Sequence, residues 1–147
     1  MPVKDTRGFE LLDHIADLGF RAWALTLPDL FAECAGALTD VLVDAETVEV
    51  RERVGSEVMG ADLESLLYAW LSEILYLYDA DGWLFKEFAI LSHRAGGSGE
   101  YLQAELAGER YDRYRHQIKT YVKAVTMHQL EVKHENELYS ARVFLDI

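Results

Sequence analysis

Residues 62–78 read DLESLLYAWLSEILYLY, and this stretch decides the fold because it carries the strongest helical pattern in the chain. Its apolar side chains recur three and four residues apart, which places them on one broad stripe of a helix. The stripe consists of Leu63, Leu66, Leu67, Trp70, Leu71, Ile74, Leu75 and Tyr78. Asp62 opens the pattern, and residues 79–82 stop it. A helix with such a stripe needs another layer on which to pack.

A second helix is predicted over residues 27–43. Thr26 can act as its N-cap, Pro28 suits its first turn, and apolar residues recur at helical spacing. The rest of the chain has the short apolar and alternating runs that are typical of strands. The predicted strands are 9–13, 18–25, 46–54, 83–93, 100–109, 122–133 and 138–147, with an irregular passage between Gly55 and Gly60.

The order of these elements, two strands, a helix, a strand, a helix and then strands, predicts an α+β fold. Residues 1–147 are expected to form a single compact domain, with the two helices packed on an antiparallel or mixed β-sheet. The glycines of residues 96–99 suggest a phosphate-binding loop at first sight. No helix follows them and no Lys-Ser or Lys-Thr pair closes the motif, so a hairpin turn is predicted there.

The composition limits the classes of function. The 147 residues carry a net charge of −12. A free-standing nucleic-acid binder neutralises phosphates with Lys and Arg, so strong direct binding of RNA or DNA is not expected. The charge favours a cation ligand, a basic protein partner or simple solubility.

The expected compartment is the cytoplasm. No apolar run reaches the roughly 18 residues of a membrane span, and the first residues lack the pattern of a signal peptide. The one cysteine, Cys34, fits a reducing compartment. Because its neighbours place Cys34 on the apolar face of a predicted helix, we expect a buried structural thiol rather than a reactive one.

Acidic groups occur near both ends of the chain. The bend between the first two predicted strands holds His14 and Asp17, and the last strand ends with the α-carboxylate of Ile147 next to the side chain of Asp146. Two adjacent carboxylates repel each other unless a cation or a basic group neutralises them. If the last strand lies beside the bend, Asp17, Asp146 and the Ile147 carboxylate form an oxygen-rich site for calcium, magnesium or manganese.

Other interpretations of these residues remain open. Asp146 could pair with a basic side chain, for which Lys123 is a candidate, and an acidic bend is also typical of ordinary turn chemistry. His14 could bind the cation, orient a ligand or satisfy a backbone group. A zinc site is not expected, because the other histidines show no zinc-ligand spacing.

Residues 110–116 read RYDRYRH and form the one basic island of the chain. The surrounding residues 108–123 hold five basic and two acidic residues, a local charge of +3, which leaves −15 for the rest. Arg110, Arg113 and Arg115 alternate with tyrosines, a composition that suits a protein interface or an RNA contact through phosphate pairing and stacking. The third interpretation is a solvated loop that balances acidic neighbours.

Five segments, taken in order, resemble the archease family. The three that carry most of the resemblance are ELLDHIADLGFRA (10–22), KTYVKAVTMHQLEV (119–132) and FLDI (144–147). DLESLLYAWL (62–71) and GERYD (108–112) are similar as well, so the resemblance covers nearly the whole chain. The sequence departs from the family pattern at Ile15, where Thr is usual, and at Met127, where an aromatic residue is usual.

The resemblance implies a protein that binds a divalent cation, with calcium expected first and magnesium or manganese as alternatives. Archeases assist the GTP-dependent RNA-splicing ligase by promoting its guanylylation and multiple turnover, and they broaden its nucleotide use. By matching position, Asp17, Asp146 and Ile147 become the metal ligands, and His14 and Lys123 become nearby functional residues. The Thr-to-Ile departure at position 15 removes one hydroxyl near that site.

We therefore expect an activator of the ligase that is not itself an enzyme. The sequence has no nucleophile elbow, no Walker loop and no dinucleotide fingerprint. One alternative is a general chaperone or assembly module for nucleic-acid-processing proteins, with the basic island as its contact surface. A metal-dependent hydrolase is a third hypothesis.

Overall fold

The computed structural model describes residues 6–13 and 17–147, which form two helices, one short 3-10 helix and eight strands. In chain order the elements are β1 (Gly8–Asp13), β2 (Asp17–Ala24), α1 (Leu27–Leu42), η1 (Ala45–Thr47), β3 (Glu52–Gly60), α2 (Leu63–Asp81), β4 (Trp83–Gly96), β5 (Gly99–Arg110), β6 (Ala124–Val125), β7 (Glu131–Glu135) and β8 (Leu138–Asp146). No helix in this part of the chain is long and apolar enough to cross a membrane.

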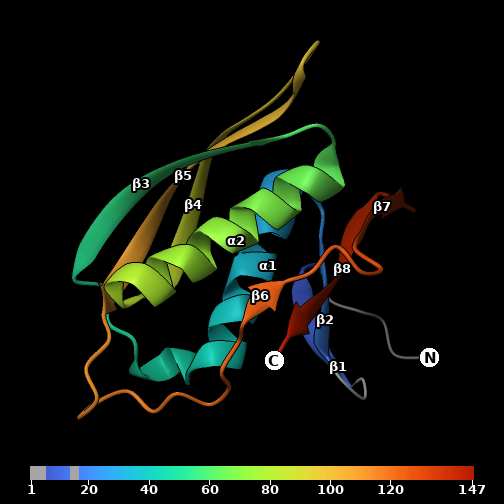
Figure 1. The fold of residues 1–147 in the computed structure, drawn as a ribbon. Coiled ribbons are helices and arrows are strands. Elements are labelled where there is room, and N and C mark those ends of the chain that lie inside the picture. Colours follow the sequence, from blue (N-terminus) through green and yellow to red (C-terminus); the bar gives the residue numbers. More distant parts are fainter. Residues whose placement is uncertain (1–5, 14–16) are drawn as a thin grey trace.

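The strands form two separate sheets with the helices between them (Figure 1). A five-stranded sheet has the order β1-β2-β8-β6, with β7 also paired to β8, and a three-stranded sheet has the order β3-β5-β4. All strand pairings among the described residues are antiparallel. The predicted α+β fold with two helices on antiparallel sheet is confirmed, although the helices cover two sheets instead of one.

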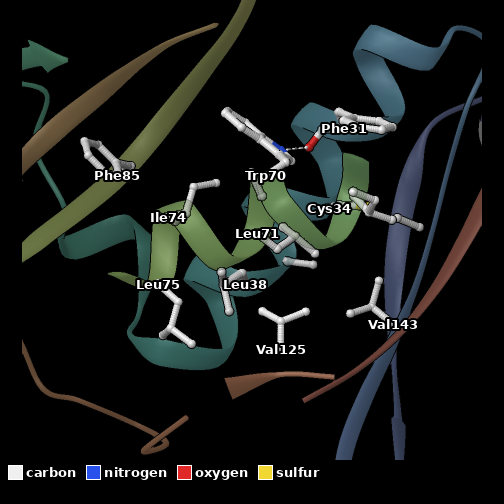
Figure 2. Close-up of a cluster of buried hydrophobic side chains, with 14 of the residues drawn as sticks. Phe31, Cys34, Leu38, Trp70, Leu71, Ile74, Leu75, Phe85, Val125 and Val143 are labelled. Atoms are coloured by element: carbon white, nitrogen blue, oxygen red, sulfur yellow. Dashed lines mark hydrogen bonds between the residues drawn. The ribbon is translucent and has the colours of Figure 1, made fainter. Parts of the chain in front are cut away.

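Helix α2 buries the stripe that its sequence predicts except at its two ends, where Leu63 and Tyr78 are half-buried. The Asp62 side chain accepts a hydrogen bond from the N–H of Ser65 over 2.8 Å, and Gly82 ends the helix in the left-handed conformation at φ 75°. Trp70 is fully buried, and its indole Nε1 donates to the carbonyl of Phe31 in α1 over 2.9 Å (Figure 2). This bond satisfies the polar edge of a large buried ring and fixes the two helices against each other.

Helix α1 lies against both sheets through β2 and β4. Thr26 caps its first turn, as the sequence predicts, by accepting a hydrogen bond from the N–H of Asp29. The buried hydroxyl of Thr39 donates to the carbonyl of Phe85 in β4 over 2.8 Å. Cys34 is fully buried on the apolar face of α1, where burial raises the pKa of its thiol, so the expectation of a structural thiol is confirmed in its placement.

The predicted strand over residues 46–54 is wrong by several residues. The Asp44 side chain accepts a hydrogen bond from the N–H of Glu46 and starts the 3-10 helix η1, so the local alternation does not become a strand there. Strand β3 begins at Glu52 and continues through Gly55 to Gly60, which the sequence assigned to an irregular passage. Gly60 passes so close to α2 that an added Cβ would lie 2.4 Å from the backbone nitrogen of Leu66.

The predicted strand over residues 122–133 is also wrong in its continuity. Within this segment two separate short strands, β6 and β7, pair with opposite ends of β8, and the residues between them form a turn in which Gln129 has a φ of 53°. The hairpin between β4 and β5 is confirmed, with Gly96 paired to Gly99. Both of its strands extend further than predicted.

Candidate functional site

Three strands meet at one end of the five-stranded sheet, where residues far apart in the sequence become neighbours. Asp17 at the start of β2 lies opposite Asp146 at the end of β8, and Ala124 of β6 lies on the other side of Asp146. The backbone N–H of Lys123 donates to the carbonyl oxygen of Asp146 over 2.8 Å. Figure 1 shows β2, β6 and the marked C-terminus gathered in this region.

The two aspartates point away from the core. Along β8 the side chain of Leu145 is fully buried, as is that of Val143, whereas Asp146 is partly exposed. Because successive side chains of a strand alternate between faces, Asp17 and Asp146 share the outer face. Directly opposite residues of an antiparallel pair have Cβ atoms about 4.5–5.5 Å apart, and like charges at that spacing destabilise the sheet. This end of the sheet therefore holds two carboxylates that a cation would stabilise.

An aromatic ring closes one side of the pair on the same face. Phe144, two residues before Asp146, is only 5% exposed, and its ring lies over Gly19 of β2, its cross-strand partner. A Cβ added to Gly19 would be 2.6 Å from Cε1 of Phe144. The ring of His128 lies beside Phe144, with the two centroids 6.2 Å apart. Close packing of this kind holds the end of β8 in one position.

The structure places together four of the five residues predicted at or near the cation site and leaves the fifth undescribed. Asp17 and Asp146 face each other, exposed Lys123 is joined to Asp146 through its backbone, and Ile147 follows with 42% of its surface exposed. His14 lies outside the described residues. No ion pair joins the Lys123 ammonium to the Asp146 carboxylate, which was the alternative interpretation of these residues.

The fit to a cation rests on the donor chemistry. Across residues 6–13 and 17–147, no group of three or more His, Cys, Asp or Glu side chains is placed to hold a metal ion. The side chains of Asp17 and Asp146 offer four carboxylate oxygens, a donor type that suits calcium, magnesium or manganese. The α-carboxylate of Ile147 is a further donor of the same kind.

A second charged cluster surrounds the buried carboxylate of Glu109, near the end of β5. Glu109 is 3% exposed, and its Oε2 accepts hydrogen bonds from the N–H of Glu49 over 2.6 Å and from Nε2 of His116 over 3.0 Å. The guanidiniums of Arg51 and Arg115 pair with its Oε1. Burial alone would raise the pKa of Glu109, but these hydrogen bonds and the Arg115 charge outweigh it and lower the pKa to about 2.

The buried ring of His116 fixes the loop after β5 against this carboxylate. Its Nδ1 accepts a hydrogen bond from the N–H of Asp112 over 2.9 Å, so the proton on Nε2 is directed at Glu109. The structural roles of Glu109 and His116 were missed from the sequence. Charged residues are seldom fully buried, and no spacing rule connects a Glu near the end of a strand with a His seven positions later in the following loop.

The three arginines of the basic island have different surroundings. Arg115 pairs with Glu109 and is 3.7 Å from an oxygen of Asp112. Arg110 lies over the ring of Trp83, and Arg113 lies over the ring of Tyr114, with centroid distances of 4.7 and 4.9 Å. All three arginines are exposed, but among the described residues only Arg115 pairs with carboxylates, so it helps to hold the fold of the loop.

Comparison with known proteins gives the family. The model of the Archease protein family (MTH1598/TM1083) matches residues 9–147. The chain belongs to the archease family. Relatives named "Protein archease" include one from Methanopyrus kandleri, 39% identical over 139 residues that cover 95% of this chain and 99% of that protein. One from Pyrococcus furiosus is 38% identical over 127 residues, 86% of this chain and 89% of its own.

Two solved structures share the archease fold. The solution structure of Methanobacterium thermoautotrophicum protein 1598 has a TM-score of 0.84 and 36% identity, covering 95% of this chain and 99% of its own. The crystal structure of a Thermotoga maritima archease, described as a possible chaperone, has a TM-score of 0.53 and 16% identity, covering 92% and 94%. The second likeness concerns the fold alone.

Proposed function

We propose that this archease activates the GTP-dependent RNA-splicing ligase through a divalent cation held by Asp17, Asp146 and the Ile147 α-carboxylate. The observation that supports the proposal is the direct cross-strand pairing of Asp17 with Asp146 on the outer face of the sheet. Two carboxylates in these positions repel each other, and a divalent cation removes that repulsion. Calcium is the first candidate, with magnesium or manganese as alternatives.

The residues around the pair suit a rigid, accessible site. Phe144 and Gly19 pack against each other on one side, which keeps the end of β8 from shifting. The Lys123 N–H holds the backbone of Asp146, while the Lys123 side chain is exposed beside the site. A bound cation would supply concentrated positive charge at this surface. Lys123 adds a second cation that could contact phosphate groups of the partner's substrate.

The proposed protein acts on its partner and carries out no reaction of its own. Its net charge of −12 is compatible with action on the ligase and its nucleotide chemistry instead of on bulk RNA. A cytoplasmic location belongs to the same proposal, because the single cysteine is a buried thiol that needs no oxidising compartment.

The test combines cation binding with ligase guanylylation. Calorimetric titration of calcium, magnesium and manganese into the isolated protein should show one site, and both Asp17→Asn and Asp146→Asn should abolish it. Wild-type protein should accelerate guanylylation of a cognate ligase by GTP and manganese, and the two variants should not. Asp79→Asn is the matched control, because Asp79 is an exposed aspartate in the last turn of α2 and the substitution changes the charge equally. A wild-type protein that leaves guanylylation unchanged would refute the proposal.

A chaperone or assembly module is the second candidate function. The Thermotoga maritima archease structure is described as a possible chaperone, and this chain exposes Arg113 and Tyr114 in its basic island. Suppression of aggregation in a heat-treated client protein measures this activity. If Asp146→Asn protects the client as well as wild type does, and fails only in ligase guanylylation, the two functions use different surfaces.

A further inference from the structure

The basic island forms one wall of a shallow concavity of about 760 Å³. The concavity is lined by Arg51, Glu52, Glu109, Arg110, Tyr111, Asp112, Arg113 and Arg115. It collects four of the nine arginines of a chain whose net charge is −12. This surface therefore has a higher density of arginines than the rest of an otherwise acidic protein.

Two of the four arginines are committed to the fold. Arg51 pairs with Oε1 of Glu109 over 3.1 Å and with Glu49 over 2.7 Å. Arg115 pairs with the same Oε1 of Glu109. Because Glu109 is buried and accepts further hydrogen bonds from the backbone and from His116, it forms a rigid base under the concavity. The positive charge of these two arginines is largely neutralised.

The other two arginines keep their charge available. In the described part of the chain neither Arg110 nor Arg113 has a carboxylate partner. Arg110 lies over the ring of Trp83 and donates to the carbonyl of Asp81, and Arg113 lies over the ring of Tyr114 and donates to its hydroxyl. A guanidinium that lies over an aromatic ring still has N–H groups that can bind a carboxylate with two parallel hydrogen bonds.

We propose that Arg110 and Arg113, with the exposed tyrosines beside them, dock an acidic segment of the partner protein. Tyr111 is 43% exposed and Tyr114 is 82% exposed, so both can cover the apolar part of such a segment. Tyr and Arg are the residues that protein interfaces favour. The proposal deepens the function above, since the partner it rests on is the ligase.

A nucleic-acid strand fits this surface less well. Residues outside 108–123 carry a charge of −15, so a phosphate backbone that runs beyond the two arginines meets a strongly acidic surface. A short segment with a few carboxylates can contact the two arginines without reaching the acidic surface around them. The concavity therefore favours a local acidic ligand over a long polyanion.

The chain connects this surface to the Asp17–Asp146 pair. Residues 111–123 leave the end of β5 and reach β6, and Figure 1 shows them crossing below the helices. They are held along the way, because the N–H of Lys119 donates to the carbonyl of Leu42 over 2.8 Å and Ile118 bridges to Val43. A partner docked on Arg110 and Arg113 is thus held where this segment begins, and the segment ends beside Asp146.

The test measures equilibrium binding of a cognate ligase to full-length variants by biolayer interferometry. Arg110→Glu/Arg113→Glu should weaken binding by about tenfold or more, because both sites then repel the acidic segment. The neutral Arg110→Gln/Arg113→Gln should lie between this variant and wild type. Arg53→Glu/Arg94→Glu is the matched control, since it makes the same charge change and Arg94 also lies over an aromatic ring, that of Tyr101. Circular dichroism and thermal unfolding confirm that each variant is folded.

The outcomes separate this inference from the proposed function. If the Arg110/Arg113 variants bind the ligase as tightly as the control does while wild type accelerates guanylylation, the inference is overturned and the proposed function stands. A wild type that binds the ligase through these arginines but does not accelerate guanylylation overturns only the proposed function. If a single-stranded RNA of 20 nucleotides, used as a fluorescent probe, binds wild type and is lost in the variants while ligase binding persists, the surface serves nucleic acid and the inference is wrong. Absence of any ligase binding refutes both.

Discussion

Asp17 and Asp146 are direct cross-strand partners at the end of the five-stranded sheet, where side chains of the two strands share the outer face. Like charges in this position oppose pairing of β2 with β8. In a buffer that contains a metal chelator, Asp146→Asn should therefore increase the free energy of unfolding by roughly 0.2–1 kcal/mol. Urea denaturation of both proteins measures the difference, which should shrink as added sodium chloride screens the charges.

A divalent cation should reverse the order of these two stabilities. A ligand that binds only the folded state stabilises it by about 2.7 kcal/mol at a free concentration 100 times its Kd. Wild type should thus become more stable than Asp146→Asn when calcium is added. If wild type is already the more stable protein in chelator, the two carboxylates do not repel each other and the geometry argued above is wrong.

Gly19→Ala should destabilise the protein through a steric clash, and not through backbone strain, because Gly19 has no positive φ. The new Cβ would lie 2.6 Å from Cε1 of Phe144 and 3.2 Å from the carbonyl oxygen of Val143. Overpacking of a closed site costs about 1–3 kcal/mol. Chemical denaturation measures this cost, and Gly55→Ala is the control, since nothing lies within 4 Å of a Cβ added in that strand.

A double-mutant cycle identifies the cause of the Gly19→Ala effect. Phe144→Leu removes the ring atoms that the new methyl group would meet, so the double variant should lose less stability than the sum of the two single variants. Additive losses would show that Phe144 is not the obstacle. If the new methyl group of Gly19→Ala displaces Phe144, cation binding should weaken as well, because Phe144 lies two residues before Asp146 in β8.

The parts of the fold that depend on local patterns could be predicted from the sequence. The stripe of α2, its cap at Asp62 and its stop at Gly82 are all contained in one continuous segment. The predicted position of strand β3 is too early in the sequence, because the alternation of apolar and polar residues begins before the strand does. The Asp44 side chain caps residues 45–47, which form a 3-10 helix instead. The division into two sheets depends on long-range pairing, which a single sequence does not display.

The candidate site likewise has features that the sequence predicts and features that depend on long-range structure. The adjacency of Asp17 and Asp146 could be stated only as a condition, because it requires the register between two strands at opposite ends of the sequence. The basic island was visible as a cluster of charge. The different role of Arg115, which pairs with a carboxylate while Arg110 and Arg113 do not among the described residues, depends on Glu109, a buried carboxylate that no sequence pattern indicates.

The thiol of Cys34 should be unreactive in the folded protein. It is fully buried on the apolar face of α1, and burial raises its pKa, so little thiolate exists at neutral pH and reagents cannot reach it. Ellman's reagent should report no thiol in buffer and one thiol per chain in concentrated urea. Rapid labelling in buffer at the rate of a free thiol would contradict this placement.

Glu109→Gln should destabilise the protein most at neutral pH. The pKa of Glu109 falls from an ordinary value of 4.5 to about 2 in the folded state. The ionised carboxylate therefore stabilises the fold fully above about pH 4.5, and this contribution is lost as the pH falls through about 2. Its size is at most about 3 kcal/mol, and partial solvent access of Arg51 and Arg115 reduces it.

Urea denaturation of wild type and Glu109→Gln at pH 7, 4 and 3 follows this contribution directly. The two stabilities should differ most at pH 7 and less at pH 3, since between about pH 4.5 and 2 the carboxyl of the unfolded chain takes up a proton while that of the folded chain stays ionised, and the difference disappears only below about pH 2. Glu105→Gln should change stability by less than about 1 kcal/mol, because Glu105 pairs with Arg53 at an exposed site. A Glu109→Gln deficit that stays constant between pH 7 and pH 3 would show that packing, and not the ionised carboxylate, holds the loop of the basic island against β5.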